Sequence, residues 1–161
     1  SLIARHVGDL QIGVYVAPSY VERLGAPAHP RELENTDHRI VGFLSSRTGK
    51  IDPLVLRSES EHIDITGSYV LAVDDGNAYL EAGLAGLGVI ALPVYMAEAH
   101  QACGSLIRLF ERWRIKPMPL YLAFPPNRHV NARLRVFIDW IVELMQQHVP
   151  NSNNKSLPPR P

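Results

Sequence analysis

The stretch VLAVDDGNAYLEAGLAGLGVIALPVYMAEA, residues 70–99, decides the fold class. Its beginning belongs to a run of apolar and β-branched residues, Tyr69–Val73, which predicts a strand. Asp74 follows as the predicted N-cap of a helix, because its carboxylate can accept hydrogen bonds from the first free backbone N–H groups. Gly86 or Gly88 is expected to end this helix, and Gly88 is placed to adopt the left-handed conformation after it.

The alternation of strand and helix continues on both sides of that helix. The apolar run VIAL, residues 89–92, is typical of a buried parallel strand, and Pro93 is expected to open the next helix as its first residue. Alternating apolar residues predict a strand over 12–16, and Pro18 sets up a short helix that ends at Gly25. Because strand–helix–strand steps form right-handed crossovers, the sequence predicts an α/β fold with a mostly parallel sheet.

The remaining segments agree with that class. A short helix is expected in the proline-spaced loop 26–36, and an amphipathic helix over 132–148. The polar, proline-rich segment 149–161 is expected to be a disordered tail. The other extended segments are 39–44, 53–58, 61–65 and 118–124, with 106–110 as a short strand or a crossover. The runs 53–58, 61–65 and 69–73 are expected to form a meander that returns to the main sheet.

Composition and charge exclude several classes of protein. The 161 residues are 46% hydrophobic, and sixteen Lys and Arg balance sixteen Asp and Glu. A net charge of zero disfavours strong binding of this chain to nucleic acid or anionic lipid. Cys103 is the only cysteine, so an intramolecular disulfide and a multi-thiolate zinc site are excluded, which favours the cytosol. We find no signal segment and no membrane-spanning apolar run, and expect a soluble, cytoplasmic protein.

The glycine motifs fail the tests for a nucleotide site. Gly42 and Gly49 in GFLSSRTGK enclose six residues instead of four, and Ile51 stands where a phosphate loop needs Ser or Thr. The glycines of residues 83–88 have the reverse order of the dinucleotide fingerprint and lie at a helix end. No G-x-S-x-G motif is present either. We therefore expect no cofactor and no catalysis.

The histidines favour structural roles. None of the seven forms an i,i+4 metal pair with another, so no metal site is expected. His100 and Cys103 lie one helical turn apart, and a helix-face histidine beside a buried cysteine is the favoured interpretation. Glu61, His62 and Asp64 lie on a predicted short strand, where alternation would point them to solvent.

Two groups of polar residues follow predicted strands. Asp74 and Asp75 open the central helix, where capping is the default role, but the carboxyl edge of an open α/β sheet is also where ligands bind. A second loop offers hydroxyls and a guanidinium that suit a small anionic or polar ligand. Its residues are Ser45, Ser46, Arg47 and Thr48. An ordinary polar surface loop is the alternative.

Four blocks of the sequence together resemble the effector-binding domain of LysR-type transcriptional regulators. They cover residues 16–33, 38–56, 71–96 and 104–145, and the similarity extends over about 1–148. The order and spacing of the blocks, above all DDGNAYLEAGLAGLGVIALP followed by PPNRHVNARLRVFIDW, make the resemblance specific.

The resemblance implies a two-lobed domain like a type 2 periplasmic binding protein, with a small effector held between the lobes. If the Ser45–Thr48 loop binds this effector, the effector is expected to be anionic. It implies homodimers or tetramers, and binding of promoter DNA through an N-terminal winged helix-turn-helix that this sequence lacks. Residues 1–9 would end the first lobe, 10–105 form the second, and 106–148 return to the first and supply its closing strand and helix.

Effector-binding residues follow from the same resemblance. By position it adds Tyr15 and Phe124, on or near the strands that flank the cleft, to the Ser45–Thr48 loop and to Asp74 and Asp75. The resulting prediction is a sensor that binds a metabolite without converting it. The alternatives are a solute-binding domain or a small α/β enzyme that uses the same cleft, with Ser45 or Asp75 as nucleophile, and a purely oligomerising module.

Overall fold

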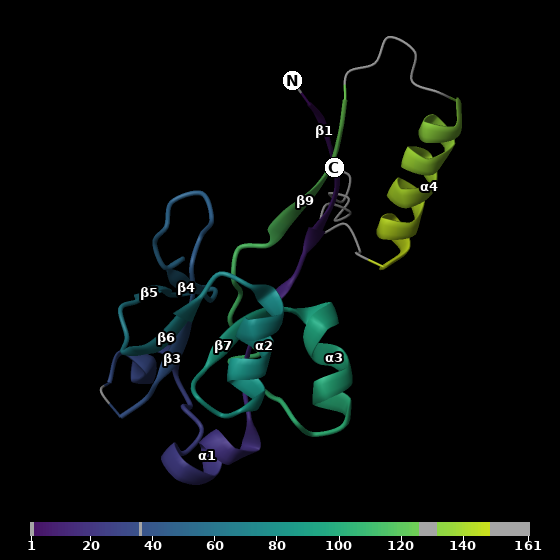
Figure 1. Cartoon of the computed structure of the whole chain (residues 1–161). Helices are drawn as coiled ribbons and strands as arrows, with labels where there is room; N and C mark the ends of the chain where they lie inside the picture. The colour runs from purple at the N-terminus through teal and green to yellow at the C-terminus, as the bar shows by residue number, and fades with distance from the viewer. Residues whose placement is uncertain (1, 36, 126–131, 149–161) are drawn as a thin grey trace, which may run out of the picture. The chain divides into compact units, whose positions relative to one another are not determined.

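The computed structural model describes residues 2–35, 37–125 and 132–148 and divides into two compact units (Figure 1). Unit 1 comprises residues 1–11 and 117–161, and unit 2 comprises residues 12–116. The predicted lobe boundaries, after residues 9 and 105, stay predictions. The predicted disordered tail, 149–161, lies outside the described residues.

Unit 2 contains every strand and helix that the sequence predicted between residues 12 and 110. In chain order they are β2 (Ile12–Val16), α1 (Pro18–Leu24), the 3-10 helix η1 (Pro30–Glu34), β3 (Ile40–Phe43), β4 (Leu54–Arg57), β5 (His62–Ile65), β6 (Tyr69–Val73), α2 (Gly76–Leu84), β7 (Ile90–Pro93), α3 (Val94–Ala102) and β8 (Ile107–Leu109). The mixed α/β class is therefore confirmed.

The backbone of Val89 joins two groups of strands in unit 2. β7, β2 and β8 form one three-stranded sheet in that order, and β3 pairs with β6. The N–H of Val89 donates to the C=O of Arg39 at 2.9 Å, and its C=O accepts from the N–H of Val41 at 3.0 Å. This parallel bridge, centred on Ile40, places β3 beside the start of β7.

The sheet is mixed, which corrects the prediction of a mostly parallel one. β3 and β6 are parallel, as is the bridge to Val89, but β2 is antiparallel to both β7 and β8. In the β7–α3–β8 unit the two strands are parallel to each other, and β2 lies between them and is antiparallel to both. β4 and β5 form a separate antiparallel hairpin instead of a meander into the main sheet. Hydrophobic periodicity locates strands but carries no information about the direction of their neighbours.

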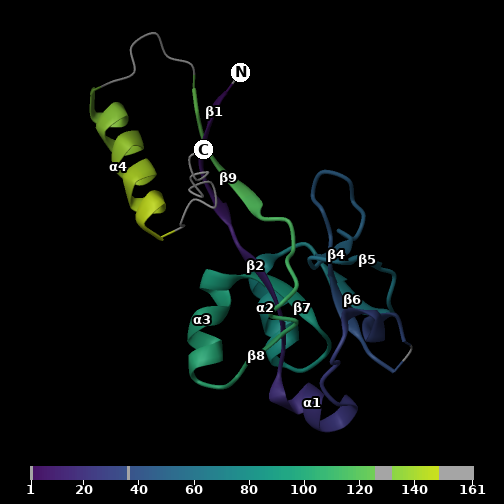
Figure 2. The same ribbon diagram turned by 180° about the vertical axis from the view of Figure 1, so that it is seen from behind.

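Alternating residues on each strand fill two hydrophobic cores, one on each face of the sheet. Figures 1 and 2 show α2 and α3 beside β7, and these helices cover one face. The core on that face contains Tyr15, Val41, Tyr79, Ala82, Ile90, Leu92, Ala97 and Leu106. The core on the other face contains Val14, Val16, Tyr20, Leu33, Ile40, Leu54, Leu56, Ile63, Ile65, Val89 and Leu109, contributed in part by α1, η1 and the β4–β5 hairpin.

Helix α2 begins one residue later than predicted. Asp75, not Asp74, is its N-cap, and Oδ1 of Asp75 accepts hydrogen bonds from the N–H groups of Asn77 and Ala78 at 3.0 and 2.9 Å. Asp74 lies in the bend between β6 and the cap. Either of two adjacent aspartates can cap a helix, so the sequence alone does not decide which one is the N-cap. The choice depends on the direction in which the chain leaves β6.

Gly86 and Gly88, which follow α2, have different structural roles. Gly86 has a φ of +71° and is the left-handed residue that ends the helix, so the expectation for Gly88 is wrong. Gly88 instead lies against backbone: a Cβ at this position would be 2.9 Å from the C=O oxygen of Arg39. Pro93 is the last residue of β7 and the N-cap of α3, not the first helical residue.

Unit 1 consists of β1 (Ile3–Leu10), β9 (Met118–Phe124) and α4 (Ala132–His148). β1 and β9 are antiparallel, α4 packs on β1, and Ile138 of α4 is buried. Arg5 of β1 forms an exposed ion pair with Asp139 of α4 at 3.3 Å. In the described ranges, no helix combines the length and hydropathy that crossing a bilayer requires.

The contact at Gly88 predicts a large cost for a single methyl group. Gly88→Ala should lower the free energy of unfolding by about 1–3 kcal/mol, because the Cβ meets backbone that cannot rotate away. Gly76→Ala is the matched control: nothing lies within 4 Å of its Cβ position, and the change should stabilise by about 0.4–1 kcal/mol. Urea unfolding of both variants tests this, and equal effects would contradict the assignment.

The cap of α2 predicts different effects for the two adjacent aspartates. Asp75→Ala should cost about 0.5–2 kcal/mol, since two backbone N–H groups lose their acceptor. Asp74→Ala should change stability by less than about 0.5 kcal/mol. The midpoints of thermal unfolding measure both, and a larger loss for Asp74→Ala would show that the cap is misassigned.

Candidate functional site

The sheet edge after β3 and β6 brings together two of the predicted groups of site residues. The N–H of Leu44 donates to the C=O of Val73 at 2.7 Å, so the two parallel strands end side by side. Ser45 follows Leu44 directly, and Asp74 follows Val73. The polar loop and the start of α2 therefore leave the sheet at one edge, where open α/β sheets bind ligands.

Backbone hydrogen bonds close the polar loop on itself. The C=O of Ser45 accepts from the N–H of Gly49 at 2.8 Å and of Thr48 at 3.3 Å, and the N–H of Ser45 donates to the C=O of Lys50 at 2.9 Å. Thr48 Oγ1 accepts from the N–H of Lys50 at 3.3 Å. Gly49 supplies the left-handed φ of +64° that the turn needs. The loop is thus held in shape by its own groups.

The side chains of the loop are open to a ligand. Ser45 is half-buried, and Ser46, Arg47 and Thr48 are exposed. Within the described part of the chain, the Ser46 hydroxyl and the Arg47 guanidinium form no hydrogen bond or ion pair. A guanidinium beside hydroxyls suits a carboxylate or another small anion. Ligand binding by this loop stays a prediction, and the alternative of an ordinary surface loop stays open.

Asp74 and Asp75 are both exposed at the same edge. The carboxylate of Asp75 is occupied by two backbone N–H groups, so its role in the structure is that of a helix cap. Among the described residues no backbone N–H group donates to the Asp74 carboxylate, so it is the more available of the two carboxylates. Whether either borders a ligand pocket stays a prediction from the resemblance.

Tyr15 lies in a hydrophobic core. It is fully buried on the face of the sheet that α2 and α3 cover. Burial raises the pKa of its hydroxyl, Arg108 acts in the opposite direction, and Glu98 raises the pKa further. The hydroxyl has no hydrogen-bond partner among the described residues. The structure therefore places Tyr15 in a core, and its assignment to an effector site stays a prediction.

Phe124 belongs to unit 1, where it ends β9 opposite Ile3 and is half-buried. The other predicted site residues belong to unit 2, and the geometry of the two units is described separately. The assignment of Phe124 to an effector site therefore stays a prediction.

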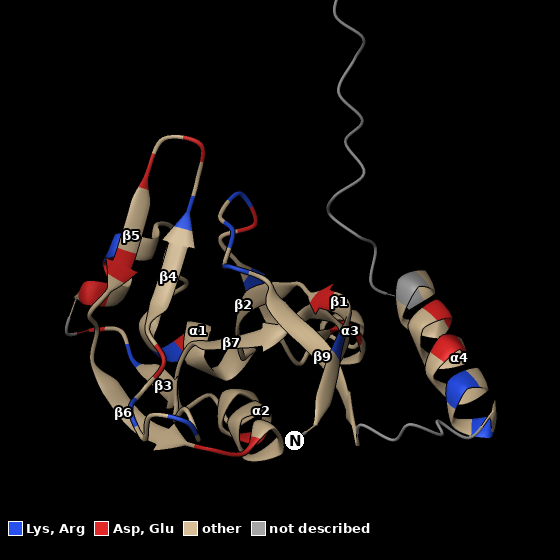
Figure 3. Ribbon diagram, turned by 90° about the horizontal axis from the view of Figure 1, so that it is seen from above, with Lys and Arg blue, Asp and Glu red and all other residues tan. Residues whose placement is uncertain are grey.

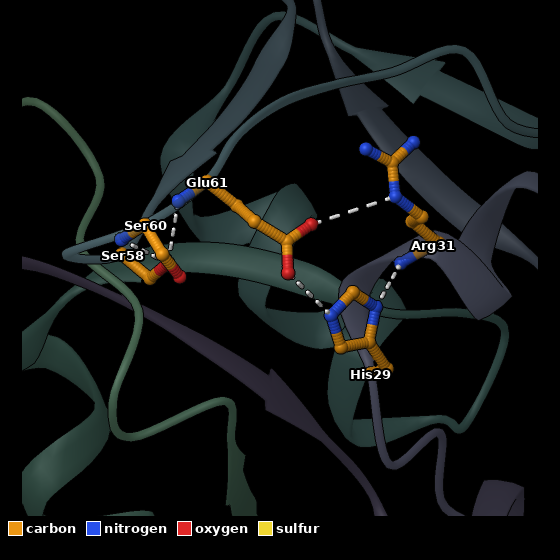
Figure 4. Close-up of polar contacts among 5 residues, drawn as sticks. All are labelled: His29, Arg31, Ser58, Ser60 and Glu61. Carbon is orange, nitrogen blue, oxygen red and sulfur yellow. Dashed lines mark hydrogen bonds and ion pairs between the residues drawn. The ribbon is translucent and has the colours of Figure 1, made fainter.

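A polar cluster that the sequence analysis missed ties η1 to the β4–β5 turn (Figure 4). Glu61 faces His29 and Arg31, at 3.6 Å from Nε2 of the histidine and 3.6 Å from Nε of the arginine. His29 Nδ1 accepts from the N–H of Arg31, and Ser58 Oγ accepts from the N–H groups of Ser60 and Glu61. About thirty residues separate the two segments, so no local pattern could have joined them. These half-exposed contacts stabilise the fold weakly.

Cys103 is exposed, which corrects the expectation of a buried cysteine beside His100. Hydrogen bonds with Ser105 lower the pKa of the Cys103 thiol. Ser105 Oγ also lies 3.3 Å from His100 Nδ1. The expectation that Glu61, His62 and Asp64 face solvent is confirmed, since all three are exposed while Ile63 and Ile65 are buried in the core.

Tyr79 is a second buried tyrosine that the sequence analysis did not single out. Its hydroxyl accepts a hydrogen bond from the N–H of Ala91 at 3.0 Å and so connects α2 to β7. Burial raises the pKa of Tyr79 to about 12. Its ring contacts that of Phe43 edge to face, with centroids 5.4 Å apart. This residue fixes the helix over the sheet edge that carries the candidate site.

The described segments contain no group of metal ligands, and residues of both charges are distributed along unit 2. Across residues 2–35, 37–125 and 132–148, no three His, Cys, Asp or Glu side chains are grouped as metal ligands would be. Figure 3 shows Lys and Arg interspersed with Asp and Glu along unit 2, in keeping with the equal totals of the two signs.

Sequence comparisons relate the chain to bacterial transcriptional regulators. It is 31% identical over 150 residues to the HTH-type transcriptional regulator YhjC of Escherichia coli, covering 92% of this chain and 49% of YhjC. It is 26% identical over 148 residues to an HTH-type transcriptional repressor of Pseudomonas aeruginosa, covering 92% of this chain and 46% of the repressor. The chain thus spans about half the length of the curated relatives it matches.

Solved structures agree with the sequence relatives. The regulatory domain of CrgA, a LysR-type transcriptional regulator from Neisseria meningitidis, superposes with a TM-score of 0.73 at 26% identity, over 89% of this chain and 69% of that domain. The regulatory domain of the C227S variant of AphB from Vibrio vulnificus shares the fold, with a TM-score of 0.73 over 88% of this chain and 69% of that one. The family model described as the LysR substrate binding domain matches residues 1–146. The chain belongs to the LysR substrate-binding domain family.

Proposed function

We propose that the chain senses a small-molecule effector for a LysR-type transcriptional regulator. The observation that carries this proposal is the LysR substrate-binding match over residues 1–146. Proteins whose names identify them as HTH-type transcriptional regulators, YhjC among them, are similar over most of the chain. The polar loop supports the proposal, because its own backbone hydrogen bonds hold its shape and it lies where the parallel strands β3 and β6 end.

The proposed binding site in unit 2 consists of the loop Ser45–Thr48 and the adjacent carboxylate of Asp74. Arg47 supplies a charge that suits an anionic effector, and the hydroxyls of Ser46 and Thr48 supply orientation by hydrogen bonds. Asp75 contributes by holding the start of α2 in place. Tyr15 and Phe124 enter the proposal only through the resemblance to the family.

The proposed mechanism is a shift between two arrangements of the regulator. An effector changes promoter binding only if it binds one arrangement more tightly than the other, and a coupling of about 1–3 kcal/mol is typical of such linkage. Promoter DNA would be bound by a helix-turn-helix module outside this sequence, in a homodimer or tetramer. A regulator of transcription works where the chromosome is, so we propose a cytoplasmic location.

An effector sensor binds its ligand without converting it. The enzyme alternative would use Ser45 or Asp75 as a nucleophile, but the backbone N–H groups of Asn77 and Ala78 already occupy the Asp75 carboxylate. No histidine or lysine side chain bonds the Ser45 hydroxyl within the described residues, so no base is in place to activate it. These contacts favour binding over turnover.

A thermal-shift screen of small aromatic and aliphatic acids tests the proposal. We expect at least one acid to raise the unfolding temperature of the chain, and Arg47→Ala and Thr48→Ala to remove that rise. Arg112→Ala is the control, because it removes another exposed arginine that is not part of the loop. Unchanged shifts in both loop variants would contradict the site, and recovery of a chemically altered ligand by mass spectrometry would contradict the sensor.

A further inference from the structure

Two buried polar atoms of unit 2 have no hydrogen-bond partner among the described residues: the hydroxyl oxygen of Tyr15 and Nε of Arg108. Tyr15 is fully buried, and Arg108 is half-buried. A buried donor that has lost water and gained no acceptor costs free energy. Native structures therefore rarely retain such groups unless something else binds them.

The two atoms lie on the same face of the sheet. Tyr15 of β2 and Arg108 of β8 are direct partners in an antiparallel ladder. Side chains of directly opposite residues leave the sheet on one face and are neighbours there. The core around Tyr15 identifies this face as the one that α2 and α3 cover.

Gly13 determines where the Tyr15 hydroxyl lies. A Cβ at Gly13 would be 2.5 Å from the hydroxyl oxygen and 2.8 Å from ring atom Cε2, so the ring lies back over Gly13. Gly13 is opposite Leu92, near the carboxyl end of β7. β7 starts beside β3 in parallel orientation. The hydroxyl therefore points toward the end of the sheet at which β3 finishes and the Ser45–Thr48 loop begins.

One positive and one negative side chain lie close to the hydroxyl. Arg108 and Glu98 of α3 are the charged groups that act on Tyr15, and its raised pKa keeps the hydroxyl protonated, as a donor, at neutral pH. Neither Arg108 nor Glu98 forms an ion pair in the part of the chain that the structure describes. On one face of the sheet, Tyr15 and Arg108 thus each carry a buried donor that has no acceptor among the described residues.

We propose that Tyr15 and Arg108 together bind a carboxylate group of the effector. One carboxylate can accept from the Tyr15 hydroxyl and from Nε of Arg108 and also neutralise the guanidinium, which a water molecule cannot do. β8 is an edge strand, so the half-buried Arg108 side chain can turn outward and admit the ligand. The inference rests on the proposed function and extends it. It adds Arg108 to the binding residues and names carboxylates as the class of ligand.

The first test needs no ligand. In the empty protein, Tyr15→Phe removes a hydroxyl without a partner and should leave the unfolding temperature unchanged or raise it. Tyr79→Phe is the matched control, since it removes a hydroxyl that accepts from Ala91 and should lower the unfolding temperature. An equal loss in both variants would show that the Tyr15 hydroxyl already has a partner and would overturn the inference.

The second test uses acetate, succinate and benzoate as probes, with acetamide and benzamide as neutral analogues. We expect a carboxylate, and not its amide, to bind the full chain, and Tyr15→Phe and Arg108→Met each to raise its dissociation constant about tenfold or more. Glu98→Gln should tighten binding, because it removes a negative charge close to the ligand.

The outcomes separate this inference from the proposed function. Carboxylate binding that Arg47→Ala removes, but that Tyr15→Phe and Arg108→Met leave unchanged, overturns the inference and keeps the loop site. If no carboxylate binds, the inference is overturned as well, whereas a neutral ligand found in a wider screen would still support the sensor. Loss of binding in all three variants would place one ligand across both groups and support both proposals.

Discussion

The pairing of Val89 with Arg39 and Val41 is the constraint on which unit 2 depends. These two backbone hydrogen bonds, of 2.9 and 3.0 Å, connect the β3–β6 pair to the β7–β2–β8 sheet. They form only because Gly88 lets the chain approach the backbone of Arg39, where a Cβ would be too close. With them, both hydrophobic cores have a continuous sheet between them.

The position of the candidate site follows from that connection. Because β3, β6 and β7 run in the same direction, their carboxyl ends share one edge, and the loop after Leu44 and the cap at Asp75 lie along it. Tyr79 holds α2 over this edge through the N–H of Ala91 in β7. The hydroxyl of Tyr15 points to the same edge from β2. The groups proposed to bind the ligand thus lie on loops and at strand ends. Buried glycines and tyrosines determine where these loops and strand ends lie.

Strand and helix positions could be predicted from periodicity, because each element repeats its apolar residues at its own spacing. The direction of β2 could not be predicted, because the sequence between Val16 and Ile40 does not indicate in which direction the chain returns to the sheet. Asp74 and Asp75 are both able to cap, so the exit of β6 decided between them. Tyr15 was assigned to the site from the resemblance alone, and the sequence did not show that its side chain is buried under α2 and α3. The cluster of His29, Arg31 and Glu61 depends on tertiary contacts alone.

Amide hydrogen exchange at Val89 and Val41 tests the central claim most directly. If their backbone pairing joins the two groups of strands, these amides should exchange only when the whole unit unfolds, as slowly as the most protected amides of β2 and β3. Fast exchange at both positions, with the other amides of β3 and those of β6 still protected, would contradict the account, because the two groups of strands would then separate while each stayed folded.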